Sequence, residues 1–119
     1  MIYLDNSATT RTLDIAADTA AQYMKADFFN PAAAYSAAVE VERNINSARA
    51  RLANAIHAQS DEIIYTSGGT ESNNTAIFGA LRARRGGGRI IVGATEHPSV
   101  YEAAMSMKGQ YVINEARVD

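Results

Sequence analysis

Hydrophobic positions predict two amphipathic helices in the first half of the chain. Over residues 12–26, apolar side chains recur at spacings of three and four, which places them on one stripe of a helix that Thr12 would cap. A longer helix is expected over residues 34–57, after the turn signal of Asn30 and Pro31. The stripes expected to be buried are Leu13, Ala16, Ala17, Ala20, Ala21 and Met24 in the first helix, and Val39, Ile45, Leu52 and Ile56 in the second.

In the second half of the chain, short apolar runs alternate with helical patterns. Runs of β-branched and aromatic residues at 63–66, 89–93 and 111–113 predict three strands, the first two of them buried. Helices are expected between them, over residues 70–84 and from Pro98 to about residue 108. Strand, helix, strand, helix, strand is the order typical of a parallel sheet with crossover helices, so the predicted fold class is α/β.

Glycine-rich and small polar stretches indicate where these elements stop. The run from Gly86 to Gly88 is expected to end the helix over residues 70–84. Residues 5–10 are small and polar, which is typical of a loop, and they follow a short extended segment at residues 2–4. The side of the 70–84 helix expected to face the core comprises Ile77, Ala80 and Leu81.

Composition narrows the class of protein. With 119 residues, 47% of them hydrophobic and 20% charged, the chain has the balance of a small globular domain. The net charge of −2 provides no electrostatic footprint for nucleic acid, and no run approaches the roughly 18 apolar residues of a membrane span. The start of the chain lacks the pattern of a secretory signal, so we expect a cytoplasmic protein. Because the chain contains no cysteine, it cannot itself supply a disulfide, a cysteine nucleophile or a cysteine-ligated metal, and no metal site is expected.

One turn carries candidate chemistry: Gly68, Gly69 and Thr70 lie between the predicted strand at 63–66 and the helix that follows it. The first turn of a helix leaves backbone N–H groups without partners, and the helix dipole adds positive charge there. Glycines let an anion approach the backbone, and the Thr70 hydroxyl adds a donor, so phosphate is the natural ligand. The residues alone leave open a second interpretation, in which the glycines make a tight turn and Thr70 merely caps the helix.

Two common phosphate motifs do not fit this turn. A P-loop has a lysine followed by Ser or Thr at the helix start, where this chain has Glu71 and Ser72. The dinucleotide-binding fingerprint needs a third glycine, which the turn lacks. A phosphate site here would therefore belong to neither class.

His97 is the second candidate because it follows the strand predicted at 89–93. Ligands of open α/β sheets bind outside the carboxyl ends of the strands, so Thr70 and His97 are expected at equivalent positions on two strands. A neutral imidazole there would stack on a flat aromatic ligand and move protons. On the residues alone, a loop histidine with no chemical task is the favoured interpretation.

These residues fall in blocks that together resemble a known family. Residues 3–10, YLDNSATT, resemble the amino-terminal signature of the cysteine desulfurases, which are pyridoxal 5'-phosphate (PLP) enzymes of the class V aminotransferase group. Residues 30–49, which begin with Asn-Pro, resemble the next block of that family. Residues 63–74, IIYTSGGTESNN, are similar to its phosphate-binding block, and residues 90–100, ending in EHPSV, to its histidine block. The four blocks stand in the family's order across nearly the whole chain.

The resemblance implies a role for each candidate residue. Gly69 and Thr70 would hold the phosphate of PLP, by backbone N–H and by hydroxyl. His97 would stack over the pyridine ring of the cofactor and help to transfer protons in catalysis. The loop around Asn6 would lie near the mouth of the active site.

The resemblance also implies a fold and an activity. The chain would be the incomplete, amino-terminal portion of the large domain of a fold type I PLP-dependent transferase. Within it, residues 1–11 would form an opening strand and active-site loop, residues 12–57 two helices, and residues 62–114 the cofactor-binding segment. The parent enzyme would convert L-cysteine to L-alanine and pass the sulfur to an enzyme cysteine as a persulfide, with a sulfur-acceptor protein as a candidate partner. A related class V aminotransferase segment, a selenocysteine lyase segment and a non-catalytic truncated fragment remain the alternatives.

The chain departs from the family pattern at five positions. Arg11 stands where the family usually has proline. Where the family has two serines, a histidine and a glycine after the Asn-Pro pair, this chain has Ala32, Ala33, Tyr35 and Ala38. The contacts that this block makes in the family, near the active site or the dimer interface, therefore do not carry over.

The largest departure is length, because members of the family are much longer chains. The family's cofactor-binding lysine and sulfur-accepting cysteine lie beyond residue 119, and neither Lys25 nor Lys108 matches the lysine position. We therefore expect the chain to be inactive alone. We also expect a homo-oligomer, or a companion chain that carries the rest of the fold, because an isolated chain would expose strand edges and apolar faces.

Overall fold

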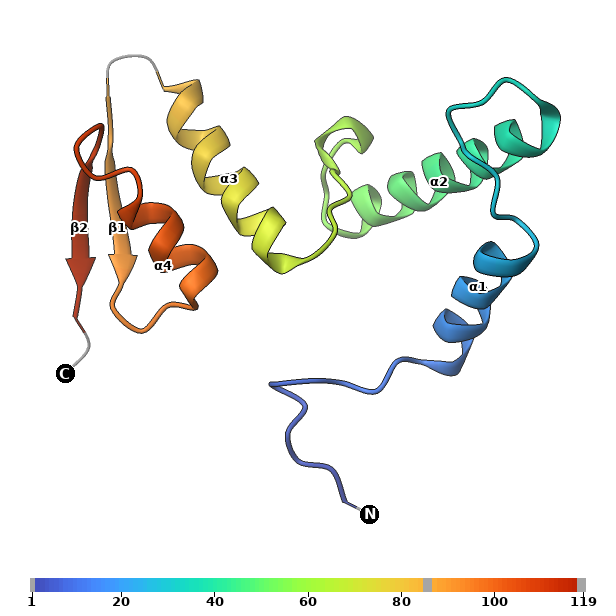
Figure 1. Cartoon of the computed structure of the whole chain (residues 1–119), viewed down its shortest axis with the longest axis horizontal. Helices are drawn as coiled ribbons and strands as arrows, with labels where there is room; N and C mark the ends of the chain where they lie inside the picture. Colours follow the sequence, from blue (N-terminus) through green and yellow to red (C-terminus); the bar gives the residue numbers. More distant parts are fainter. Residues whose placement is uncertain (1, 85–86, 118–119) are drawn as a thin grey trace. The chain divides into compact units, whose positions relative to one another are not determined.

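The computed structural model describes residues 2–84 and 87–117, and the chain divides into two compact units (Figure 1). The first unit comprises residues 1–63 and the second comprises residues 64–119. The boundary separates the helices of the first half from the alternating helices and strands of the second half.

Both helices expected in the first unit form, and each is slightly shorter than the hydrophobic pattern predicts. They are α1 (Asp14–Lys25) and α2 (Ser36–Ala55). The cap predicted at Thr12 is wrong, because the helix begins later and Leu13 takes the N-cap position with no side-chain hydrogen bond. A short 3₁₀ helix, η1 (Ser60–Glu62), packs against α2. None of the helices among the described residues is both long and apolar enough to cross a membrane.

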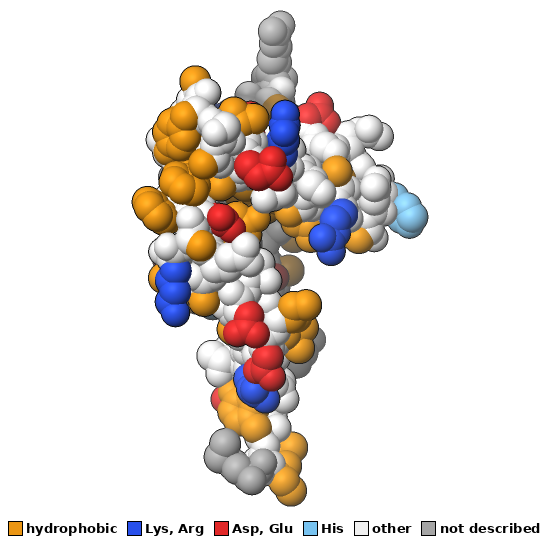
Figure 2. Space-filling view, turned by 90° about the vertical axis from the view of Figure 1, so that its right-hand side faces the viewer, with side chains coloured by type: hydrophobic (Ala, Val, Ile, Leu, Met, Phe, Trp, Pro, Cys, Tyr) orange, Lys and Arg blue, Asp and Glu red, His pale blue; other side chains and the backbone are white. Residues whose placement is uncertain are grey.

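The buried side of these helices differs from the predicted one. Leu52 is 50% exposed and Ile56 is 66% exposed, although the pattern places both on the buried stripe of α2. Helix α1 buries none of its side chains. Apolar periodicity marks the face that can be buried, but burial requires a partner surface, and hydrophobic side chains reach the surface in Figure 2. The residues that α2 does bury are Ala38, Val41 and Ala53.

The second unit alternates helices and strands. Its elements are α3 (Gly69–Ala83), β1 (Arg89–Gly93), α4 (Pro98–Met105) and β2 (Val112–Ala116). The two strands pair in parallel, and α4 forms the crossover between them. The structure thus confirms the α/β class with parallel strands, and Pro98 occupies the first turn of α4 as expected.

The strand predicted at residues 63–66 is wrong. These residues belong to no strand, and the sheet formed by the described residues has the order β1-β2. Ile64, expected to be buried, is 68% exposed. An isolated β-branched run keeps an extended backbone, but it becomes a strand only when a neighbour pairs with it, which a local sequence pattern does not reveal.

The opening segment is a loop, as expected, but its extended residues are not part of a sheet. Ile2 is 88% exposed and Leu4 is 89% exposed, and Met1 lies outside the described residues. The Tyr3 hydroxyl lies 2.8 Å from the carbonyl oxygen of Thr9, which closes the loop on itself.

Helix α3 ends before the glycines that were expected to stop it. Its last residue is Ala83, and Arg84 continues in extended backbone. Gly86 lies outside the described residues. Gly87 has a φ of +86°, in the left-handed region that favours glycine.

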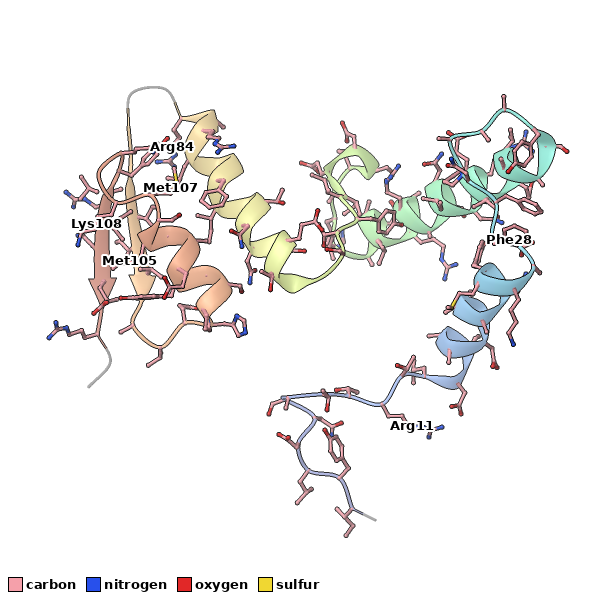
Figure 3. The ribbon with its side chains drawn as sticks, viewed as in Figure 1. Arg11, Phe28, Arg84, Met105, Met107 and Lys108 are labelled. Carbon is pink, nitrogen blue, oxygen red and sulfur yellow. The ribbon has the colours of Figure 1, made fainter. Side chains whose placement is uncertain are left out.

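The core of the second unit lies where α4 packs against α3 and β1. Leu81 on α3 is 7% exposed, as predicted, whereas Ala80 is exposed and Ile77 is half-buried. Ile77, Ala80 and Leu81 line a hollow of about 320 Å³ together with residues of β1. The other buried residues of this unit are Val92, Ala103, Ala104 and Met107, the last labelled in Figure 3.

A hydrogen bond links α4 to the strand that follows it. The Tyr101 hydroxyl donates to Oε2 of Glu115 over 2.6 Å. This bond raises the pKa of Tyr101, because ionisation would remove the donated hydrogen and place a phenolate beside a carboxylate.

Candidate functional site

The first turn of α3 exposes backbone donors. Gly68 is the N-cap, and its carbonyl oxygen accepts the first helical hydrogen bond, from the Ser72 N–H over 3.1 Å. Among the described residues, no acceptor pairs with the N–H of Gly69 or Thr70, or with the Thr70 hydroxyl. A Cβ built on Gly68 or Gly69 would meet no atom within 4 Å, so the backbone of this turn is open to a ligand. Gly68 takes the N-cap position and Thr70 is the second residue of the helix, so Thr70 is not the N-cap residue.

Glu71 lies in the same turn, but its carboxylate is bonded away from these donors. Its Oε2 accepts from the Ser67 hydroxyl over 2.6 Å and from the Ser67 backbone N–H over 2.7 Å. These two bonds, the hydroxyl first, hold the pKa of Glu71 below its ordinary value. The carboxylate therefore accepts hydrogen bonds from the residue before the N-cap, Ser67, and not from the N–H groups of Gly69 and Thr70.

The Ser67→Ala substitution should raise the pKa of Glu71 toward its ordinary value of 4.5, because it removes the larger of the two stabilising bonds. The backbone bond remains, so the pKa should stay below 4.5. A lowered pKa in the folded chain means that the ionised group adds stability above pH 4.5 and that this stability is lost as the pH falls through the lowered value. An NMR titration of the Glu71 carboxyl carbon measures the change. Ser60→Ala is the control, because Ser60 lies in the other unit. Equal Glu71 titration midpoints in the two variants would contradict the role of the Ser67 hydroxyl.

His97 lies directly before α4, at the carboxyl end of β1. It is the N-cap of the helix, and its Nδ1 accepts the backbone N–H of Ser99 over 3.1 Å. The Ser99 hydroxyl oxygen lies 2.8 Å from the same nitrogen. Because Nδ1 accepts, the neutral ring carries its proton on Nε2, a tautomer assigned from these hydrogen-bond partners. The ring is exposed.

The starts of α3 and α4 lie at the same end of the second unit. Asn73, the fifth residue of α3, donates from Nδ2 to the Ser99 hydroxyl oxygen over 2.8 Å, which joins the amino-terminal parts of the two helices. In Figure 1, both helix starts lie at the end to which the β1 arrow points. The structure therefore brings Gly69, Thr70 and His97 to the carboxyl end of β1, where ligands of open α/β sheets bind.

Comparison with known proteins places this chain in a family. The profile of the family described as Aminotransferase class-V matches residues 2–119. The chain belongs to the class-V aminotransferase family. This family and the cysteine desulfurases within it depend on PLP.

The class-V relatives that the chain resembles include several cysteine desulfurases. Cysteine desulfurase IscS of Methanosarcina thermophila is 39% identical over 110 residues, which cover 92% of this chain and 27% of that protein. Cysteine desulfurase IscS of Dictyoglomus turgidum is 42% identical over 102 residues, 85% of this chain and 26% of that protein. The chain thus spans about a quarter of the length of the curated relatives that it matches.

Two solved structures share the fold. A protein described as a NifS-like protein aligns with a TM-score of 0.82 and 27% identity, over 92% of this chain and 31% of that one. A structure described as SspA in complex with cysteine aligns with a TM-score of 0.84 and 28% identity, over 95% of this chain and 33% of that one. The likeness identifies the chain as a partial class-V fold.

Lys108, one of the two lysines of this class-V chain, lies away from the site at the start of α4. Lys108 lies between α4 and β2, at the opposite end of α4 from His97. Since α4 has 8 residues, about 12 Å separate its two ends. Figure 3 labels Lys108 beside the strands, away from the start of α4. Lys25 and Asn6 belong to the first unit, so the expected position of Asn6 at the active-site mouth stays a prediction.

Sequence reasoning did not single out Asn73 and Ser99, which connect the two predicted site elements. Both residues stand in the blocks that resemble the class-V family, at the starts of helices expected on one edge of the sheet. These positions could have indicated a contact, because two short polar side chains near adjacent helix starts can form a hydrogen bond with each other. The pattern alone does not reveal that the helices pack closely enough for this bond.

Proposed function

We propose that this chain is the cofactor-binding segment of a PLP-dependent cysteine desulfurase. In this proposal the backbone N–H groups of Gly69 and Thr70, with the Thr70 hydroxyl, hold the phosphate of PLP. His97 lies against the ring of the cofactor and carries protons. The observation that supports the proposal is the set of unoccupied donors on Gly69 and Thr70, joined to the His97 end of α4 by the Asn73–Ser99 hydrogen bond.

The donor set fits the chemistry of a phosphate ester. A phosphate dianion needs several hydrogen-bond donors and gains from the positive end of a helix dipole. The turn offers two N–H groups and one hydroxyl, and no side chain within 4 Å of the Gly68 or Gly69 Cβ positions would block the approach. A hydrogen bond to a charged group contributes about 1.5–3 kcal/mol, so three such bonds can hold a small ligand.

His97 is suited to proton transfer through one defined atom. When bound, PLP supplies the electron sink for bond cleavage at the substrate. With Nδ1 held by Ser99, the nitrogen that can release or accept a proton is Nε2. The fixed Nδ1 also limits rotation of the imidazole, so the ring can present one face to a flat ligand.

The activity of the whole protein is proposed from its relatives. Those relatives are named cysteine desulfurases, and one structural neighbour is described in complex with cysteine. We infer that the protein takes L-cysteine, releases L-alanine and passes the sulfur to a cysteine thiol as a persulfide. Because this chain contains no cysteine, that thiol belongs to another segment or to another chain, and a second protein can then accept the sulfur.

The exposed apolar side chains support a partner for this segment. Ile64 is 68% exposed and Ile91 is 71% exposed, in the unit that carries the candidate site. Surfaces of this kind are usually covered in a working protein. We therefore propose that the segment acts within a homo-oligomer or with a companion polypeptide that supplies the rest of the large domain.

The Thr70→Val substitution should weaken binding of pyridoxine 5'-phosphate by roughly 10- to 100-fold, because it removes a hydroxyl that donates to a charged group but keeps the side-chain shape. This ligand lacks the aldehyde of PLP and so cannot react with Lys25 or Lys108. A titration of the ¹⁵N-labelled chain, followed at the amides of Gly69 and Thr70, measures the affinity. Thr75→Val in the same helix is the matched control and should leave the affinity unchanged.

Pyridoxine without phosphate is the second control in this titration. It should leave the Gly69 and Thr70 amides unshifted at concentrations where its phosphate ester saturates them. Equal shifts with both compounds would contradict the phosphate assignment. No shift with either compound would favour a non-catalytic fragment that does not hold the cofactor.

A further inference from the structure

Three polar side chains join the starts of α3 and α4 in a continuous line of hydrogen bonds. Asn73 Nδ2 lies 2.8 Å from the hydroxyl oxygen of Ser99, and that oxygen lies 2.8 Å from Nδ1 of His97. The backbone N–H of Ser99 donates to the same Nδ1 over 3.1 Å. Ser99 thus contacts His97 twice and α3 twice, because its carbonyl oxygen also accepts from Nδ2 of Asn74 over 3.5 Å.

The chemistry of these groups fixes the direction of each bond. The amide nitrogen of Asn73 can only donate, so the Ser99 oxygen accepts from it. Because the Ser99 backbone N–H donates to Nδ1 of His97, this nitrogen is an acceptor, and the Ser99 hydroxyl must donate to it as well. With two donors aimed at it, Nδ1 cannot carry a proton in the neutral ring, and the proton lies on Nε2.

We propose that Ser99 is a positioning residue that holds His97 in its Nε2–H tautomer, and that Asn73 orients the Ser99 hydroxyl for this task. The relevance to catalysis rests on the proposed function, in which Nε2 is the proton-carrying atom. Through Asn73 the arrangement also ties the imidazole to the helix whose first turn holds the proposed phosphate site. The line through Asn73 and the Ser99 hydroxyl therefore links the imidazole to α3, beside the Asn74 bond to the Ser99 carbonyl oxygen.

A simple helix cap would not require this arrangement. Capping needs only an acceptor for the backbone N–H of Ser99, and His97 Nδ1 already provides it. The Ser99 hydroxyl and the Asn73 amide add two bonds that leave the backbone of α4 unchanged. Both residues are half-buried, which reduces competition from water and strengthens the bond between them.

The Ser99→Ala substitution separates the two roles, because it removes the hydroxyl and keeps the backbone N–H. The ratio of Nε2–H to Nδ1–H tautomer at His97 should fall about fivefold, the effect of losing one ordinary hydrogen bond. Long-range ¹H–¹⁵N spectra of the imidazole nitrogens measure this ratio on the full chain, in alkaline buffer where imidazole is neutral. Ser99→Thr keeps a hydroxyl and should retain the original ratio.

A second variant and a control keep the result interpretable. Asn73→Ala should lower the tautomer ratio in the same direction, since the Ser99 hydroxyl loses the group that orients it. Ser106→Ala makes the same serine-to-alanine change at the other end of α4, where the hydroxyl donates to Ala103 O over 2.8 Å, and should leave His97 unchanged. An unchanged ratio in both Ser99→Ala and Asn73→Ala would overturn the proposal.

The measurement is made without PLP or any analogue. Its outcome therefore does not depend on the proposed function, which the titration at Gly69 and Thr70 tests separately. A failed titration with a normal tautomer response would overturn the cofactor assignment and leave the positioning of His97 standing. A successful titration with no tautomer response would overturn the positioning of His97 and leave the cofactor assignment standing.

Discussion

Replacing Leu81 by alanine should cost the second unit about 2–3 kcal/mol of stability, a large share of what a unit of this size holds. Leu81 is 7% exposed, and its side chain lies among the few buried residues where α3 meets α4 and β1. Its carbonyl oxygen also accepts the Tyr111 hydroxyl over 3.2 Å, so the backbone at this position is tied to the segment that precedes β2. Truncation would leave a cavity that a unit with such a small core fills poorly.

Amide hydrogen exchange measures this loss. The N–H of Ala94 donates to the Ala116 carbonyl oxygen over 2.8 Å at the end of the two-stranded sheet and should report the opening of the unit. Leu52→Ala is the matched control, because it makes the same change in a helix at a residue that is 50% exposed. This substitution should lower the opening free energy that amide exchange reports for α2 by less than about 1 kcal/mol. Equal losses for the two leucines would show that the burial described for Leu81 is wrong.

The contrast between these leucines also shows what the sequence could and could not predict about the fold. Spacing placed both on apolar helix faces, and both helices formed. Whether such a side chain is buried depends on the surface packed against it: Leu81 is 7% exposed, on a helix that packs against α4, whereas Leu52 is 50% exposed. The run at 63–66 illustrates the same limit for strands, because β-branched residues favour extended backbone but pairing depends on a neighbour. Local features were predicted well, such as Pro98 in the first turn of α4 and the parallel order of β1 and β2.

In the candidate site, too, local positions could be predicted from the sequence, but a contact between helices could not. The places of Gly69 and Thr70 at a helix start and of His97 after a strand could be predicted from the local pattern. Their roles toward a cofactor came from the family resemblance and stay a prediction. The Asn73–Ser99 bond could not be predicted, because it exists only when α3 and α4 pack with their amino-terminal parts adjacent. It is a tertiary contact between residues 26 positions apart. A residue's place along an element is thus more visible in the sequence than its contact with another element.

The His97→Asn substitution should lower turnover of L-cysteine by about 10²- to 10⁴-fold, the usual contribution of a positioned acid or base. The assay uses the chain in place of the matching segment of the Methanosarcina thermophila relative, which is 39% identical over 110 residues. Release of L-alanine from L-cysteine is measured. Asparagine is chosen because it is among the best N-cap residues, so the start of α4 should be preserved while the imidazole is lost. Affinity for pyridoxine 5'-phosphate at Thr70 should therefore change much less than turnover.

His57→Asn is the matched control for this experiment, since it removes the other histidine by the same substitution. His57 has a φ of +57°, and asparagine is one of the residues that tolerate this left-handed conformation. The variant should keep its turnover within about twofold, because a compatible surface substitution rarely changes the free energy of unfolding by more than about 0.5 kcal/mol. Similar losses in both variants would indicate damage to the fold. A His97→Asn enzyme that retains turnover would remove the imidazole from the chemistry while leaving the phosphate assignment at Gly69 and Thr70 intact.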